Sequence, residues 1–136
     1  LVKNIMDQVK RNDNKKKILI CVPVGEEHHL GCDVLETYLS SKGFKIYNMG
    51  TSMPTESILN FIDNNKPDAI IISITIKDNL LAGQRLVRKI NKECNIPIFI
   101  GGLAIQEKNI PKFDGKIIGD MDLKEIKKEI GCEING

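Results

Sequence analysis

The stretch "DAIIISIT" at residues 68–75 decides the fold class of this 136-residue chain. An apolar run that does not alternate with polar residues is typical of a strand buried on both faces. The stretches "KILICVP" at residues 17–23 and "IPIFIGG" at residues 96–102 have the same character. Strands of this kind occur in parallel sheets that carry helices on each side.

Segments with helical spacing of apolar residues separate these runs. After the first strand we expect a helix that packs on the sheet through Leu30, Val34 and Tyr38, with Leu35 and Leu39 beside them. Three more helices are predicted around residues 54–62, 80–90 and 123–130, and two more strands at residues 45–50 and 115–119.

The strict alternation of strands and helices predicts an α/β fold. We expect a flavodoxin-like (Rossmann-like) doubly wound five-stranded parallel sheet with strand order 2-1-3-4-5. Residues 17–136 would form this domain. Residues 1–16 differ, because "LVKNIMDQVK" has helical spacing and precedes the polar "RNDNKKK". We interpret residues 1–16 as a helix remnant and a linker, and the first residue, Leu1, is consistent with a piece cut from a longer protein.

Composition narrows the function classes. The formal net charge of +2 is too small to argue for nucleic-acid binding. No apolar run is as long as a membrane span, and no signal-peptide pattern opens the chain. The four cysteines form no close pair, so we expect reduced thiols in a cytoplasmic protein.

Ligands of open α/β sheets bind beyond the carboxyl ends of the strands. This rule selects three predicted loops, at residues 25–31, 73–79 and 101–104. The first contains "GEEHHLG", which places two glutamates and two histidines side by side.

These loops are compatible with some classes of site and not with others. A receiver domain needs a phosphate-accepting aspartate after strand 3, where this chain has Ser73-Ile74-Thr75. The carboxylates of Glu26 and Glu27 would repel the phosphate of a flavin. A zinc site formed by His28, Cys32 and an acid remains open, as does a solvated helix cap made by the glutamates and histidines.

Taken together, the three loops resemble the cobalamin-binding domain family. The family pattern is Asp-x-His-x-x-Gly, then Ser-x-Leu, then Gly-Gly, at spacings close to those found here. This chain has Glu26-x-His28-x-x-Gly31, then Ser73-x-Thr75, then Gly101-Gly102. It departs from the pattern at Glu26, where aspartate is usual, and at Thr75, where leucine is usual.

The resemblance implies a cofactor, either adenosylcobalamin or methylcobalamin, and a role for each matching residue. His28 would bind the lower face of cobalt in place of the cofactor's own dimethylbenzimidazole, and Glu26 would hold the other ring nitrogen. Ser73 and Thr75 would line the slot for the displaced nucleotide tail.

The glycines would serve the same slot. Gly101 and Gly102 would let the tail approach the backbone, and Gly31 would let the first helix begin close to the tail.

The turn "PVGEEHHLG" at residues 23–31 resembles the PxGExHxxG turn in cobalamin domains of MerR-type transcriptional regulators, including light-responsive ones. This resemblance implies a sensory domain and not an enzyme. Its partners would be an upstream helical-bundle cap and a DNA-binding domain, and a homo-oligomer is compatible with it. The alternatives are a corrinoid protein that carries methyl groups for a methyltransferase partner and a subunit of a cobalamin-dependent mutase.

Overall fold

The computed structural model describes residues 15–135. Its sheet has five parallel strands in the order β2-β1-β3-β4-β5, so the predicted fold class and strand order are confirmed. The strands are β1 Lys17–Cys21, β2 Lys45–Met49, β3 Ala69–Ser73, β4 Ile98–Gly101 and β5 Lys116–Ile117. The expected helix remnant falls on residues 1–14, which lie outside the described residues.

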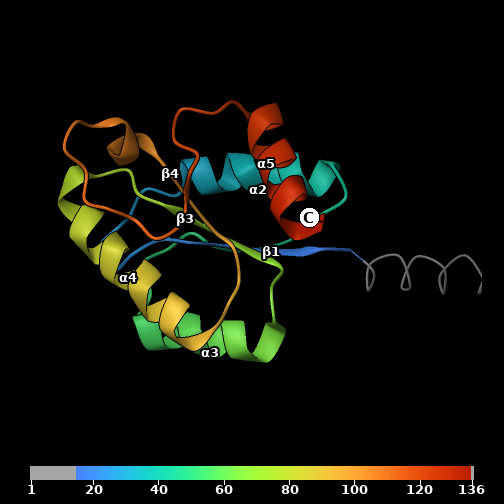
Figure 1. The fold of residues 1–136 in the computed structure, drawn as a ribbon, viewed down its shortest axis with the longest axis horizontal. Helices are drawn as coiled ribbons and strands as arrows, with labels where there is room; N and C mark the ends of the chain where they lie inside the picture. The colour runs from blue at the N-terminus through green and yellow to red at the C-terminus, as the bar shows by residue number, and fades with distance from the viewer. Residues whose placement is uncertain (1–14, 136) are drawn as a thin grey trace, which may run out of the picture.

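Helices cover both faces of the sheet (Figure 1). One layer consists of α2 (Leu30–Ser41) and α5 (Leu123–Asn135), and the other consists of α3 (Thr55–Asn65) and α4 (Leu80–Glu93). Two short 3-10 turns, η1 (Lys77–Asn79) and η2 (Leu103–Gln106), follow β3 and β4. No helix of residues 15–135 has both the length and the apolar character needed to cross a membrane.

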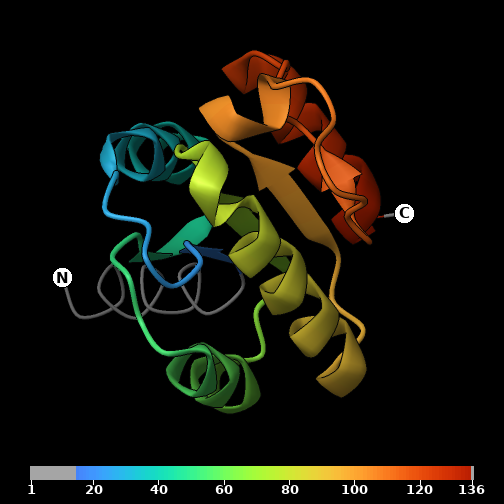
Figure 2. The same ribbon diagram turned by 90° about the vertical axis from the view of Figure 1, so that its left-hand side faces the viewer.

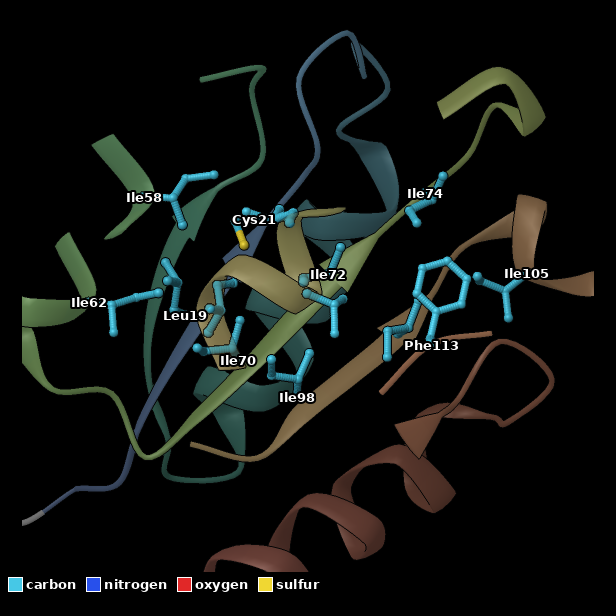
Figure 3. Close-up of a cluster of buried hydrophobic side chains, with 14 of the residues drawn as sticks. Leu19, Cys21, Ile58, Ile62, Ile70, Ile72, Ile74, Ile98, Ile105 and Phe113 are labelled. Atoms are coloured by element: carbon cyan, nitrogen blue, oxygen red, sulfur yellow. The ribbon is translucent and has the colours of Figure 1, made fainter. Parts of the chain in front are cut away.

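The alternation of side chains along each strand divides the core into two layers. Ile18, Ile20, Ile71 and Phe99 pack toward α2 and α5. Neighbouring positions such as Leu19, Ile70, Ile72 and Ile98 pack toward α3 and α4 (Figure 3). Full burial of each such side chain contributes roughly 1.5–3 kcal/mol to folding, which explains why the central strands contain so few polar residues.

The predicted packing face of α2 is partly wrong. Leu30 is 75% exposed and Val34 is 47% exposed. The helix instead buries Cys32 and Leu39, with Leu35 and Tyr38 partly buried. A helical repeat identifies several candidate stripes, and the rotation of the helix on the sheet decides which of them is buried.

The end of α2 agrees with the prediction. Gly43 follows the C-cap residue Lys42 in the left-handed region, with φ +95°. Its N–H donates to the carbonyl of Ser40, and the N–H of Phe44 donates to that of Leu39. This pattern is a Schellman cap, and it turns the chain directly into β2.

Candidate functional site

The loops after β1, β3 and β4 meet at the carboxyl edge of the sheet, which faces the viewer in Figure 2. Glu26 lies in the first of these loops and is completely buried. Its Oε2 accepts a hydrogen bond from Asn79 Nδ2 at 2.7 Å and a longer one from the Ile76 N–H at 3.4 Å. Both donors belong to the loop after β3, so the carboxylate ties two loops together.

The second carboxylate oxygen of Glu26 is directed toward His28. Glu26 Oε1 is buried and has no hydrogen-bond partner among the described residues, while His28 Nδ1 lies 3.4 Å from it. The His28 side chain is 57% exposed, so its ring can move the few tenths of an ångström that a normal hydrogen bond needs. An Nδ1–H group that donates to Oε1 leaves Nε2 free to bind a metal.

His29 has a different partner. Its Nδ1 lies 2.9 Å from Asp33 Oδ2, one turn along α2. Asp33 Oδ1 also accepts a hydrogen bond from Asn48 Nδ2 of β2, at 2.9 Å. These hydrogen bonds, that of His29 first, lower the pKa of Asp33. His29 therefore belongs to the start of α2, and His28 to the turn that contains the buried carboxylate.

A cavity of about 350 Å³ lies between α2 and α5, at the carboxyl ends of β3 and β4. Four of the predicted site residues line it, namely Gly31, Ser73, Gly101 and Gly102. Thr75 is not among its lining residues. A larger cavity of about 540 Å³ lies near the amino ends of β4 and β5, beside Pro97 and Lys116, and none of the predicted site residues lines it.

The glycines of this cavity have different surroundings. A Cβ at Gly31 would find no atom of the described residues within 4 Å. A Cβ at Gly101 would lie 3.3 Å from Cγ1 of the Ile118 side chain. Gly102 has φ +102°, and a Cβ there would overlap the backbone oxygen of Ile74 and lie 2.7 Å from its nitrogen. Gly102 is therefore required by the fold, whereas the space beside Gly31 is open.

The alternative readings of the histidine loop do not fit this geometry. No group of three His, Cys, Asp or Glu residues within 15–135 is arranged to hold a metal ion. Cys32 is buried, and burial raises the pKa of its thiol to about 11, so the thiolate that zinc requires is disfavoured. The solvated-cap reading is wrong for Glu26, because that side chain has no exposure to solvent.

Asn79 is a site residue that the sequence did not reveal. It lies at the end of η1, and its amide is the closest donor to the buried carboxylate of Glu26. A buried carboxylate requires a donor. The sequence alone could indicate that a buried glutamate needs a hydrogen-bond donor. It could not indicate which polar residue of the three loops, here Asn79, would be that donor.

The family model for the B12 binding domain matches residues 16–123 of the chain. The chain belongs to the B12-binding domain family. Cobalamin is accordingly the cofactor of this domain. The matched range begins next to β1 and ends at the first residue of α5.

Two curated relatives are methionine synthases. The chain is 25% identical over 108 residues to that of Mycobacterium tuberculosis, a match that covers 74% of the chain and 9% of the relative. It is 22% identical over 94 residues to that of Mycobacterium leprae, covering 67% of the chain and 8% of the relative. The matched part of the chain thus spans less than a tenth of either enzyme.

Solved structures share the fold. The methanol:cobalamin methyltransferase complex of Methanosarcina barkeri matches with a TM-score of 0.78 and 19% identity, over 96% of this chain and 53% of that one. A cobalamin-binding protein of Desulfitobacterium hafniense matches with a TM-score of 0.61 and 17% identity, over 96% of this chain and 55% of that one. A response regulator receiver protein of Sinorhizobium medicae matches with a TM-score of 0.58 and 15% identity, over 90% of this chain and 97% of that one. This receiver therefore has the same architecture.

The geometry at Gly102 leads to a stability prediction. We expect Gly102→Ala to lower the free energy of unfolding by about 1–3 kcal/mol, because alanine is strained at this φ and its Cβ meets rigid backbone. Urea unfolding without cobalamin measures the change. Gly101→Ala is the control, and its free energy of unfolding should fall less, since the added Cβ meets a side chain that can shift. A Gly102→Ala protein as stable as the parent would contradict the assignment.

Proposed function

We propose that this domain binds cobalamin with the cofactor's own base displaced from cobalt and with His28 in its place. The observation that carries the proposal is the buried carboxylate of Glu26, whose unpaired oxygen lies 3.4 Å from His28 Nδ1. Histidines that bind metals commonly donate their second ring nitrogen to such an acceptor, which sets the tautomer and raises the basicity of the ligand.

Asn79 and Glu26 have different parts in holding His28: Asn79 donates a hydrogen bond to Glu26, and Glu26 would accept one from His28. The amide of Asn79 can only donate through Nδ2, so it serves one oxygen of the Glu26 carboxylate and leaves the other to the histidine. That second oxygen would accept a hydrogen bond from the Nδ1–H group of His28, which directs the lone pair of Nε2 to the metal. When bound, cobalamin supplies a cobalt centre that can carry an alkyl group.

The cavity between α2 and α5 suits the displaced nucleotide tail. It opens at the same sheet edge as His28 and is lined by Gly31, Ser73, Gly101 and Gly102. The hydroxyl of Ser73 offers one hydrogen bond at its base, since Ser73 is 6% exposed and ends β3. Thr75 is half-buried and lies outside the lining, so we give it no part in the slot.

Exposed apolar side chains mark the face that would receive the corrin ring. Each of the three loops at the carboxyl edge contributes one, Val24 after β1, Ile76 after β3 and Leu103 after β4. Apolar groups gathered around a binding site indicate a surface that is covered by a ligand or partner. The flat, largely apolar underside of a corrin would cover them while His28 reaches its metal.

Within this family, we favour a corrinoid carrier of methyl groups over the regulator suggested by the turn sequence. Two relatives are methionine synthases, and one structural neighbour is a methanol:cobalamin methyltransferase complex. A methyltransferase would then be the partner. The sensory portion of a transcriptional regulator, with a helical-bundle cap and a DNA-binding domain, remains the second candidate because of the "PVGEEHH" turn at residues 23–29.

The first prediction of this proposal distinguishes the two histidines. His28→Ala should abolish the absorption spectrum of imidazole-ligated cobalamin, because no other ring is held by the buried carboxylate. His29→Ala should keep that spectrum, since His29 is paired with Asp33. Absorption spectra of both variants with methylcobalamin test this. The reverse result would exchange their roles, and two unaffected spectra would overturn the proposal.

A second prediction concerns the open space at Gly31. In the absence of cobalamin, Gly31→Ala should raise the free energy of unfolding by up to about 1 kcal/mol, the helix propensity gain of alanine. It should also weaken cobalamin binding by about 1–3 kcal/mol, because its Cβ would overpack the occupied cavity.

Gly131→Ala provides the matched control. Gly131 also lies in a helix, α5, with no atom of the described residues within 4 Å of an added Cβ, but it does not line the cavity. It should gain similar stability in urea unfolding and leave cobalamin titrations unchanged. If Gly31→Ala binds cobalamin as tightly as the control does, the tail does not lie beside Gly31.

The carrier role leads to a third prediction. A methyl carrier has to keep its corrinoid when cobalt is reduced to Co(I), a state that gives up the axial histidine, so the tail cavity must hold the cofactor by itself. We expect the chain loaded with hydroxocobalamin to retain its corrinoid when titanium(III) citrate reduces cobalt to Co(I) and methyl iodide then methylates it, with iodide as the leaving group. Gel filtration and absorption spectra after each step measure the retention. Release on reduction would contradict the carrier role and leave the sensory role as the better reading.

A further inference from the structure

The side chains that line the cavity between α2 and α5 are nearly all apolar. Leu35, Ile71, Ile118 and Ile126 line its inner part, and further lining comes from Leu30, Val34, Met121 and Leu123. Among its lining residues, Ser73 is the one whose side chain carries a nitrogen or oxygen atom. The side chains therefore offer a single hydroxyl to any polar ligand that enters.

Three backbone carbonyls of residues that line the cavity already accept hydrogen bonds. The carbonyl of Gly101 accepts from the Ile74 N–H at 2.9 Å, and that of Gly102 accepts from the Ile105 N–H at 3.2 Å. The carbonyl of Gly119 accepts from Gln106 Nε2 at 2.8 Å. A ligand amine in this cavity would have to compete for carbonyls that hold the two turns together.

We propose that this cavity selects corrinoids by the polarity of their lower base, favouring a benzimidazole over a purine. The inference rests on the proposed function, because it requires the displaced base to enter the cavity. Dimethylbenzimidazole presents carbon at its outer edge, which matches Leu35, Ile118 and Ile126. Adenine presents an amine and ring nitrogens, for which the side chains that line the cavity offer the hydroxyl of Ser73 alone. One polar group left unpaired on burial is enough to lower affinity by about tenfold or more.

The test compares three corrinoids on the parent protein. Cobalamin, its analogue with adenine as the lower base, and cobinamide, which has no base, are titrated under the same conditions. Free corrinoids differ in how readily the base leaves cobalt, so each affinity is corrected for the base-off fraction of the free corrinoid, measured by pH titration. We expect cobalamin to bind at least about tenfold more tightly than the adenine analogue after this correction.

A variant inside the cavity tests the cause. Val34 lines the cavity but is 47% exposed, so Val34→Asn adds an amide there without disturbing the buried core. We expect Val34→Asn to reduce the ratio of cobalamin affinity to adenine-analogue affinity by at least about threefold. This is less than the effect of one fully buried hydrogen bond, because the position is half-exposed. Thr37→Asn, one turn further along α2 and outside the cavity lining, is the control and should leave the preference unchanged.

The outcomes separate this inference from the proposed function. If cobalamin fails to bind, or binds without a spectrum that depends on His28, the proposed function is wrong and the inference with it. If cobalamin shows that spectrum but binds no more tightly than the adenine analogue, base selection is overturned and the proposed function stands. Cobinamide that binds as tightly as cobalamin would also overturn base selection, because the cavity would then contribute nothing.

Discussion

The two central strands, β1 and β3, are apolar on both faces, and the rest of the molecule is arranged around them. Residues 18–22 and 69–72 have no solvent exposure. Only helices on both sides of a parallel sheet can cover such strands, and parallel connections bring every carboxyl end to one edge. Glu26 and Asn79 therefore lie 2.7 Å apart, although 53 positions separate them in the sequence. The site is a consequence of how the core is covered.

Burying the carboxylate of Glu26 opposes folding and has to be offset by hydrogen bonds. Removal of a charge from water costs several kcal/mol unless donors replace the solvent. Asn79 and the Ile76 N–H donate to one oxygen, whereas the other has no hydrogen-bond partner among the described residues and lies 3.4 Å from His28 Nδ1. In the proposed function, that unpaired oxygen is the acceptor that would orient the ring of His28.

The glycines at the carboxyl edge show that one motif can contain two physical requirements. Gly102 has a positive φ and close contact with the Ile74 backbone, so the chain itself requires it. Gly31 has no such contact, and the open space beside it belongs to the cavity. The same cavity explains why Leu30 and Val34, which have the spacing of core residues, are exposed. They form its rim and not part of the core of the sheet.

The sequence by itself determined the α/β class, the strand order, the edge that holds the site and the family, because burial periodicity and short loop motifs are local properties. It also predicted the pairing of Glu26 with His28, two residues apart. It could not determine the rotation of α2, the identity of Asn79 as the donor or the separate roles of Gly31 and Gly102. Each of these depends on contacts between segments that only the packed sheet brings together. Tertiary structure decided them, because the distance between two loops is fixed by the whole core between them.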